Sequence, residues 1–156
     1  MTAVHHAFEI FRVLIVDDSR TLRRILVQEL NSIGIHNIVQ AGDGLEALQR
    51  LKGGDIDLML LDMEMPELDG LGVLQMLKEE DRAMSFSIIV ISGADDLSGP
   101  IKCIQMGAED YLPKPFDPVL LQARIFSSFE KMRLRMLDRQ RLEDLEREKL
   151  CSRPSR

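Results

Sequence analysis

Four short apolar runs, separated by segments with helical spacing, constrain the fold of this chain more than any other feature. The runs are FRVLIVDD (11–18), NIVQA (37–41), DLMLLD (57–62) and SIIVIS (87–92), and a weaker fifth candidate is DYLPK (110–114), which a proline shortens. They are too short and too uniformly apolar for surface helices, and they are typical of strands buried on both faces of a parallel sheet. We therefore predict five parallel strands.

The segments between these runs have the apolar spacing of helices. The residues concerned are Leu22, Ile25, Leu26, Leu30 and Ile33; Ala47, Leu48 and Leu51; Leu71, Leu74 and Leu77; and Ile101 and Ile104 with Gln105. Capping and helix-breaking residues flank them, as Ser19 and Gly34 flank the first. The pattern predicts an α/β protein of the (βα)5 type, in which helices cover both faces of a doubly wound, five-stranded parallel sheet. The loops after the strands are then the expected functional site.

The last helix is expected to start at Asp117 and Pro118 and to extend well past the sheet. No glycine or proline interrupts residues 119–150, and these 32 residues at about 1.5 Å each span roughly 48 Å. Four apolar residues have the 4, 3, 4 spacing of a coiled-coil seam: Ile125, Phe129, Met132 and Met136. The alternative is a solvated helix with i, i+4 pairs such as Glu143 with Arg147. We place a main domain at 10–128 and a helical extension, a short coiled coil or a linker, at 129–156.

Composition excludes several classes of protein. Of the 156 residues, 45% are hydrophobic, which is enough for one core. The apolar runs are far shorter than a membrane span, and the first residues lack the pattern of a secretory signal, so we expect a cytoplasmic protein without membrane association. Residues 124–156 carry 10 Lys/Arg and 6 Asp/Glu, whereas the rest carries 10 and 20. An acidic body with a mixed-charge tail argues against direct binding of nucleic acid.

The cysteines and the paired histidines predict no site. Cys103 and Cys151 lie far apart without a CxxC pattern, which indicates neither a zinc site nor a disulfide framework. His5 and His6 are adjacent, and no acid or thiol cluster lies beside them in the sequence. We expect ordinary thiols and no metal at the histidines.

Polar groups follow the predicted strands where each strand ends. They are Asp17 and Asp18 after the first run, Asp62 after the third, Ser92 after the fourth and Lys114 after the fifth. A doubly wound sheet brings these ends to one edge. Clustered carboxylates repel one another, so we expect Mg²⁺, a hard cation that prefers oxygen ligands and phosphate groups. A carboxylate that attacks phosphorus would gain from this charge, and the amine and the hydroxyl would bind phosphoryl oxygens.

A simpler interpretation applies to each residue alone. An aspartate after a strand is most often a helix cap, and Asp18 or Ser19 fits that description. Five suitable groups at successive strand ends are much harder to explain by chance. We therefore interpret the set as one site.

These motifs resemble a known family. VDD (16–18), DMEMPELDG (62–70), ISG (91–93) and YLPKPF (111–116) are similar, in order and spacing, to the signature of bacterial two-component response-regulator receiver domains, which have the flavodoxin-like, CheY-like fold. The resemblance covers about residues 10–128.

The resemblance implies a role for each matching residue. Asp62 would be the phosphoacceptor, and Mg²⁺, or Mn²⁺ in its place, would be held by Asp17, Asp18, Asp62 and the main-chain carbonyl of Glu64. Lys114 and Ser92 would contact the phosphoryl group, Ser92 and Tyr111 would be the switch residues, and Pro115 would follow a cis peptide bond. Glu64 is an acidic choice at a variable position and is expected to alter the lifetime of the phosphorylated state, whereas Ala94 leaves its side of the site open.

The implied function is phosphorylation-controlled signalling rather than enzymatic turnover. A sensor histidine kinase or phosphotransfer protein would phosphorylate Asp62, and the domain would assist its own phosphorylation and dephosphorylation. The change would reach a surface in residues 97–125, formed by the fourth helix, the fifth strand and the fifth helix, and a homodimer through this face or the C-terminal helix is expected.

The sequence leaves three alternatives open. In the first, the chain is the N-terminal receiver of a longer protein with an enzymatic output domain, such as a nucleotide cyclase, a diguanylate cyclase or a phosphatase. It would otherwise be an aspartate-nucleophile phosphatase of the haloacid dehalogenase type, although no cap-sized insertion is present. A flavin-binding protein is disfavoured because no Ser/Thr/Gly-rich loop follows the first strand.

Overall fold

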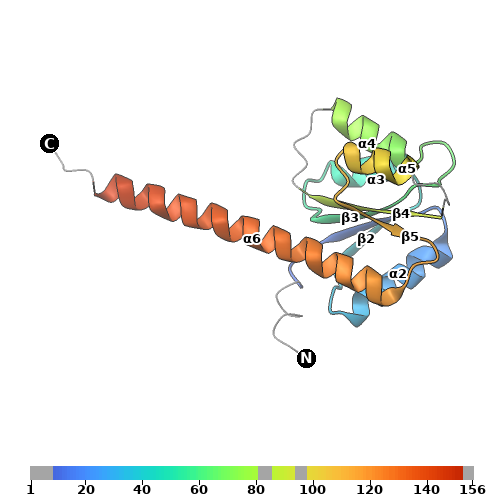
Figure 1. Ribbon diagram of the computed structural model, residues 1–156, viewed down its shortest axis with the longest axis horizontal. Helices are drawn as coiled ribbons and strands as arrows, with labels where there is room; N and C mark the ends of the chain where they lie inside the picture. Colours follow the sequence, from blue (N-terminus) through green and yellow to red (C-terminus); the bar gives the residue numbers. More distant parts are fainter. Residues whose placement is uncertain (1–8, 81–85, 94–97, 153–156) are drawn as a thin grey trace.

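The computed structural model describes residues 9–80, 86–93 and 98–152. His5, His6 and Ala94 lie outside these ranges. Within them, strands and helices alternate as predicted, and α6 extends from one end of the sheet (Figure 1).

A five-stranded, fully parallel sheet forms the centre of the protein. Its strands are β1 (Val13–Val16), β2 (Ile38–Ala41), β3 (Leu58–Asp62), β4 (Ser87–Ser92) and β5 (Asp110–Pro113), in the spatial order β2-β1-β3-β4-β5. The three central strands β1, β3 and β4 are buried along their whole length. This burial on both faces explains why their sequences are continuously apolar rather than alternating.

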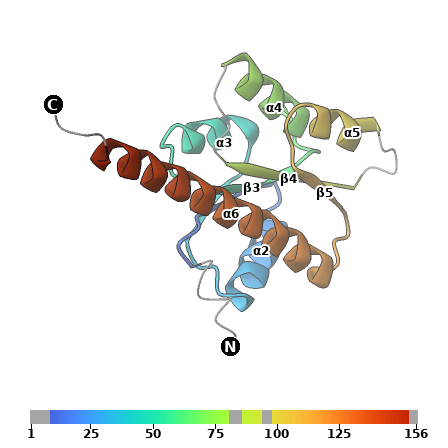
Figure 2. The same ribbon diagram turned by 60° about the vertical axis from the view of Figure 1, so that its left-hand side comes forward.

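Among the described residues, five helices cover the sheet on two sides (Figures 1 and 2). The helix bounds are α2 (Arg20–Ser32), α3 (Gly44–Leu51), α4 (Gly70–Glu79), α5 (Ser98–Gln105) and α6 (Pro118–Cys151). One apolar core lies between the sheet and the pair α2 and α6, and a second lies between the sheet and α3, α4 and α5. Alternate residues of each strand point into one core or the other, so the predicted doubly wound α/β fold is confirmed.

Helix caps lie where the sequence predicted them for α2 and α6. The Ser19 hydroxyl accepts a hydrogen bond from the Leu22 amide, and the Asp117 carboxylate accepts one from the Val119 amide. Gly34 follows α2 with a φ of 91°, the left-handed conformation that favours glycine. In α5, by contrast, the predicted apolar pair Ile101 and Ile104 is exposed, since Pro100 and Cys103 face the core instead.

The 34-residue helix α6 has a buried first half and an exposed second half. Ile125, Phe129 and Met132, three of the four predicted seam residues, pack into the protein's own core, and Phe129 stacks on Phe11 with ring centroids 4.6 Å apart. Met136 is 53% exposed, and every described residue from Arg133 onward is exposed. The predicted boundary at residue 128 stays a prediction, and the buried contacts of α6 extend four residues past it.

Two expectations about the whole chain concern its cysteines and the membrane. Cys103 and Cys151 are both free thiols, the first buried and the second exposed. In the part of the chain that the structure describes, no helix is both long enough and apolar enough to cross a bilayer.

Candidate functional site

Strand register brings the predicted site residues to one edge of the sheet. In the pairing of β1 with β3, Val16 lies opposite Leu61, so the next residues along the two strands, Asp17 and Asp62, end neighbouring strands. Ser92 is the last residue of β4 and pairs with Pro113 of β5, after which the Lys114 amide donates to the Ser92 carbonyl at 2.7 Å. Parallel pairing therefore places groups from four strand ends side by side.

Asp62 lies at the centre of this group and is 1% exposed. Its Oδ1 accepts hydrogen bonds from Lys114 Nζ at 2.7 Å and from the Glu64 amide at 3.2 Å. Its Oδ2 is buried and has no hydrogen-bond partner among the described residues. Burial disfavours the charged form and raises the pKa of Asp62 to about 6, although the hydrogen bond from Lys114 works in the opposite direction. One oxygen is thus held by hydrogen bonds, and the other is a buried acceptor that a cation or a reacting atom could satisfy.

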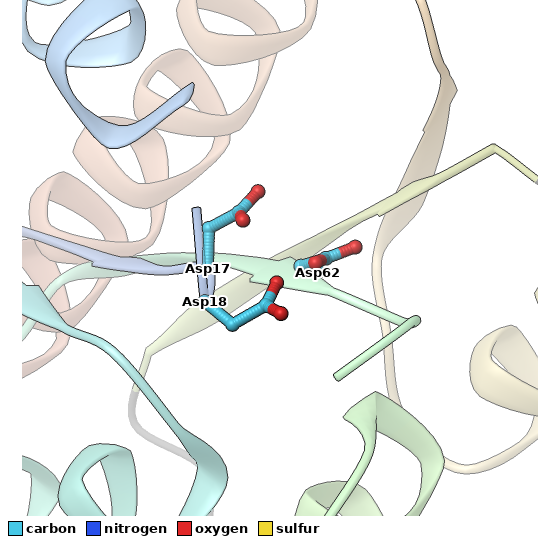
Figure 3. A group of neighbouring side chains, drawn as sticks. All are labelled: Asp17, Asp18 and Asp62. Atoms are coloured by element: carbon cyan, nitrogen blue, oxygen red, sulfur yellow. The ribbon is translucent and has the colours of Figure 1, made fainter. Parts of the chain in front are cut away.

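Three carboxylates form a cluster that fits a hard divalent cation. Asp17, Asp18 and Asp62 each offer an oxygen within 4.8 Å of the others, and Figure 3 shows them on adjacent strand ends. Asp17 is buried, which raises the pKa of its carboxyl group, and the exposed Asp18 leaves the cluster open on one side. Oxygen donors, an unpartnered buried oxygen and an open side are what Mg²⁺ requires when it keeps waters or phosphate oxygens as ligands. The residues present therefore fit the expected ion.

Lys114 bridges the acidic groups. Its Nζ is 2.7 Å from Asp62 Oδ1 and 3.7 Å from Asp17 Oδ2. Burial alone would lower the pKa of Lys114, but the hydrogen bond and charge of Asp62, with Asp17 nearby, outweigh it and raise the pKa. The ammonium group of Lys114 therefore stays charged and faces the carboxylates of Asp62 and Asp17.

Glu64 contributes its side chain as well as its backbone. Its Oε1 accepts a hydrogen bond from Ser92 Oγ at 2.7 Å, and its Oε2 accepts one from the Gly93 amide at 3.2 Å. Burial on its own would raise the pKa of Glu64, but these two hydrogen bonds, with Lys114 nearby, outweigh it and lower the pKa. The sequence predicted a main-chain carbonyl ligand at Glu64 and an effect of its acidic side chain on the lifetime of the phosphorylated state, but not these two side-chain contacts.

The two remaining predicted residues lie on and after β5. Tyr111 is half-buried and pairs with Val90; because Leu112 faces the core of α2 and α6, strand alternation places Tyr111 on the opposite face. The Lys114–Pro115 peptide bond is cis. The switch role of Tyr111 stays a prediction.

Two supporting residues were missed by the sequence analysis. Arg23 Nη1 donates to the Asp17 carbonyl at 2.6 Å, and its Nε donates to Gln40 Oε1 at 3.2 Å, which ties α2 to the ends of β1 and β2. A Cβ at Gly70 would lie 2.7 Å from the Asp62 carbonyl oxygen, so the start of α4 packs against Asp62 only because residue 70 is glycine. The Asp-Gly pair at 69–70 signals a helix start, whereas nothing in the sequence marks Arg23.

Comparison with known proteins assigns the chain to a family. The model of the response regulator receiver domain matches residues 13–126. The chain belongs to the response regulator receiver domain family. It is a signalling domain of the two-component type, and the resemblance noted in its motifs is confirmed.

Individual relatives carry the same domain in chains of different length. A protein of Porphyridium aerugineum named as a probable transcriptional regulator, ycf27, is 40% identical over 121 residues, which are 78% of this chain and 49% of that protein. The crystal structure of a two-component system response regulator/GGDEF domain protein superposes with a TM-score of 0.76 at 33% identity, covering 83% of this chain and 53% of the other. The CheY of the CheX-CheY-BeF3-Mg complex from Borrelia burgdorferi has a TM-score of 0.70 at 35% identity, and the match covers 76% of this chain and 89% of the CheY chain. The chain spans about half the length of the first two.

Proposed function

We propose that the receiver is phosphorylated on Asp62 by the phosphohistidine of a sensor kinase or phosphotransfer protein, in a Mg²⁺-dependent reaction. The observation that carries the proposal is the Asp62 carboxylate itself. One oxygen is fixed by Lys114 and the Glu64 amide, and the other has no hydrogen-bond partner among the described residues and lies beside two further acids. A solved relative, the CheY of Borrelia burgdorferi, is described in complex with beryllofluoride and magnesium, which supports the same chemistry here.

The transfer step depends on the roles of these groups. An oxygen of the Asp62 carboxylate forms a bond to phosphorus while the P–N bond of the donor breaks, and the electron pair of that bond returns to the imidazole nitrogen, which takes up a proton. Asp17, Asp18, Asp62 and the Glu64 carbonyl would hold the Mg²⁺, whose charge would neutralise the phosphoryl oxygens. Later attack by water breaks the P–O bond, releasing phosphate and restoring the carboxylate.

Lys114 and Ser92 supply the contacts that distinguish the modified state. A phosphoryl group adds negative charge and three strong acceptor oxygens next to an ammonium and a hydroxyl. Lys114, which now pairs with Asp62, would bind a phosphoryl oxygen, and Ser92 would donate to another. These contacts would bias β5, α5 and the first half of α6 between two arrangements, with Tyr111 following the change.

A surface beside the site suits a helical donor protein. Leu22 and Ile25 of α2, with Pro115, Phe116 and Pro118 after β5, line an open pocket of about 450 Å³ that reaches Lys114. Ile25 is 37% exposed, although it belongs to the apolar stripe of α2. A partner that packs an apolar helix here would bring its phosphohistidine to the strand ends, and we infer that the kinase or phosphotransfer protein docks on this face.

The exposed second half of α6 could link the receiver to another domain or to a second copy of the chain. This chain covers 53% of the response regulator/GGDEF protein and 49% of the ycf27 protein. We infer that α6 either joins the receiver to an output domain or joins two receivers in a dimer. The cytoplasmic location stays a prediction. Sequencing the gene beyond codon 156 distinguishes a fused output from a separate regulator.

Mass spectrometry after incubation with acetyl phosphate and Mg²⁺ tests the site, the metal and the chemistry together. The protein should gain one phosphoryl group, which Asp62→Asn abolishes and removal of Mg²⁺ by a chelator prevents. Asp69→Asn is the matched control, because this residue lies in the same loop and asparagine also caps a helix. Labelling of Asp62→Asn at the level of the unmodified chain would refute the assignment.

A further inference from the structure

The Glu64 carboxylate occupies the hydrogen-bond donors that a phosphoryl group on Asp62 would need. Ser92 Oγ donates to Glu64 Oε1 at 2.7 Å and the Gly93 amide donates to Oε2 at 3.2 Å. The amide of Glu64 meanwhile donates to Asp62 Oδ1 at 3.2 Å, so one residue contacts both the acceptor and the hydroxyl beyond it. Ser92 is 1% exposed, which leaves its hydroxyl little freedom to turn toward solvent.

We propose that Glu64 is a positioning residue that holds Ser92 in the unphosphorylated receiver, and that its carboxylate must be displaced before Ser92 can bind the phosphoryl group. The proposal rests on the proposed phosphorylation of Asp62 and adds an internal competitor to it. The free energy needed to displace Glu64 therefore reduces the stability of the phosphorylated, switched state.

Hydrogen-bond capacity makes the two contacts mutually exclusive. A serine hydroxyl has one proton and a main-chain amide has one, so each makes its strong hydrogen bond to one anion at a time. A carboxylate and a phosphoryl group are both acceptors of this kind, and they repel each other when close. Formation of a bond from Ser92 to the phosphoryl group therefore requires Glu64 to move away.

The position of Glu64 permits that movement. The residue is exposed, and it lies in the loop between β3 and α4 rather than within a strand or helix. Its carboxylate can rotate into water, where hydration replaces the two hydrogen bonds it loses. Asp62 and Ser92, which end buried strands, stay in place while this happens.

The first test measures the affinity for beryllofluoride, an analogue of the phosphoryl group, in excess Mg²⁺ by calorimetry. Glu64→Gln removes the charge and weakens the hold on Ser92, so its apparent Kd should fall about tenfold, the effect expected of one hydrogen bond to a charged group. Glu67→Gln removes the same charge from the same loop and should change the Kd less than about twofold, because an exposed charge is largely screened by solvent.

A double substitution separates displacement of Ser92 from simple charge repulsion. If Glu64 acts through the hydroxyl, the gain from Glu64→Gln should largely disappear when Ser92→Ala is also present. An equal gain with and without Ser92→Ala would show that Glu64 only repels the anion, and it would overturn the proposal. An unchanged Kd for Glu64→Gln alone would overturn it as well.

The second test needs neither metal nor phosphodonor. In ¹H–¹⁵N spectra of the metal-free protein, the Gly93 amide resonance should shift in Glu64→Gln and stay in place in Glu67→Gln. An unmoved Gly93 amide would overturn the proposal. A further outcome is that the unmodified chain fails to bind beryllofluoride while the Gly93 amide still shifts in Glu64→Gln. That result would refute both the phosphorylation and the competition that rests on it, and it would leave only the contact between Glu64 and Gly93 established.

Discussion

Lys114 Nζ lies 2.7 Å from Asp62 Oδ1, although the two residues are 52 positions apart and lie at the ends of different strands. The ion pair exists because β4 separates β3 from β5 by a single strand, and because Lys114 reaches across the end of β4 toward Asp62. The amine that neutralises the buried carboxylate is also the group best placed to bind a phosphoryl group, if Asp62 is phosphorylated as proposed. Occupation of Asp62 therefore has to break or rearrange this contact.

Replacement of this amine tests its part in the switch. Lys114→Ala leaves the three carboxylates in place, so Mg²⁺ should still bind, and more tightly, because a competing cation is gone. The response to beryllofluoride should be lost, since no ammonium remains to follow the new charge. Isothermal titration with Mg²⁺ and amide spectra of β5 measure the two effects. Lys102→Ala, an exposed lysine on α5, is the control, and a normal spectral response in Lys114→Ala would exclude the role.

The raised pKa of Asp62 predicts an unusual pH dependence of stability in the absence of metal. Burial raises the pKa from 3.8 to about 6, so the folded protein binds this proton more tightly than the unfolded chain. The free energy of unfolding should therefore decrease as pH rises from about 4 to 6, by roughly 1–3 kcal/mol. Asp62→Asn removes the Asp62 part of this decrease, whereas the buried Asp17, whose pKa is also raised, still contributes. The variant should be more stable than the unmodified chain at pH 7, but not at pH 4. Urea denaturation at pH 4 and pH 7 measures the free energy of unfolding of both proteins. If the difference between them is the same at the two pH values, the raised pKa of Asp62 is not its cause.

The strand positions and the placement of four polar residues at one edge of the sheet were predictable from this sequence, because both depend on hydrophobic pattern and topology. Apolar runs too short for helices specify buried strands, and parallel order then forces Asp17, Asp62, Ser92 and Lys114 to a common edge. The side-chain contacts of Glu64 were not predictable, because they depend on how a loop turns after β3. The exposed position of Ile101 and Ile104 was missed for a similar reason: a two-turn helix is too short for its apolar spacing to decide which face is buried.

Close packing at Gly70 predicts that the acceptor loop tolerates no side chain there. In Gly70→Ala, the new Cβ would lie 2.7 Å from the Asp62 carbonyl oxygen and 2.9 Å from the Met63 Cα, and backbone atoms cannot move aside freely. We expect a loss of about 1–3 kcal/mol in the free energy of unfolding and slower labelling by acetyl phosphate. Gly42→Ala is the control, because its Cβ would meet only side-chain atoms at 3.5 Å or more. Equal stability of the two variants would show that the loop adjusts.

Arg23 is predicted to support the proposed Mg²⁺ site without contacting the ion. Its guanidinium fixes the Asp17 carbonyl at 2.6 Å and Gln40 at 3.2 Å, so Arg23→Ala should loosen the turn that carries Asp17 and Asp18. Removal of a nearby positive charge alone would tighten binding of a cation. We nevertheless expect Mg²⁺ affinity to fall severalfold, because the geometry of hard oxygen ligands matters more for this ion. Arg24 is an exposed neighbour on α2, so Arg24→Ala shows the effect of losing the charge alone. Equal Mg²⁺ affinities in the two variants would argue against a role of Arg23 in positioning Asp17 and Asp18.

The second half of α6 is predicted to be dispensable for folding but necessary for association. Phe129 and Met132 belong to the core, so a deletion should begin after Arg133 rather than after the predicted domain boundary. Removal of residues 134–156 should preserve cooperative unfolding and lower the dimer content in sedimentation experiments, if the exposed helix forms a coiled coil. Met136 is the one predicted seam residue that is not packed into the protein's own core, so Met136→Glu should weaken association in the full chain if the helix pairs there. Leu134→Glu, equally exposed but off the predicted seam, should not. Unchanged sedimentation after the deletion would favour a solvated helix, and α6 would then serve as a linker.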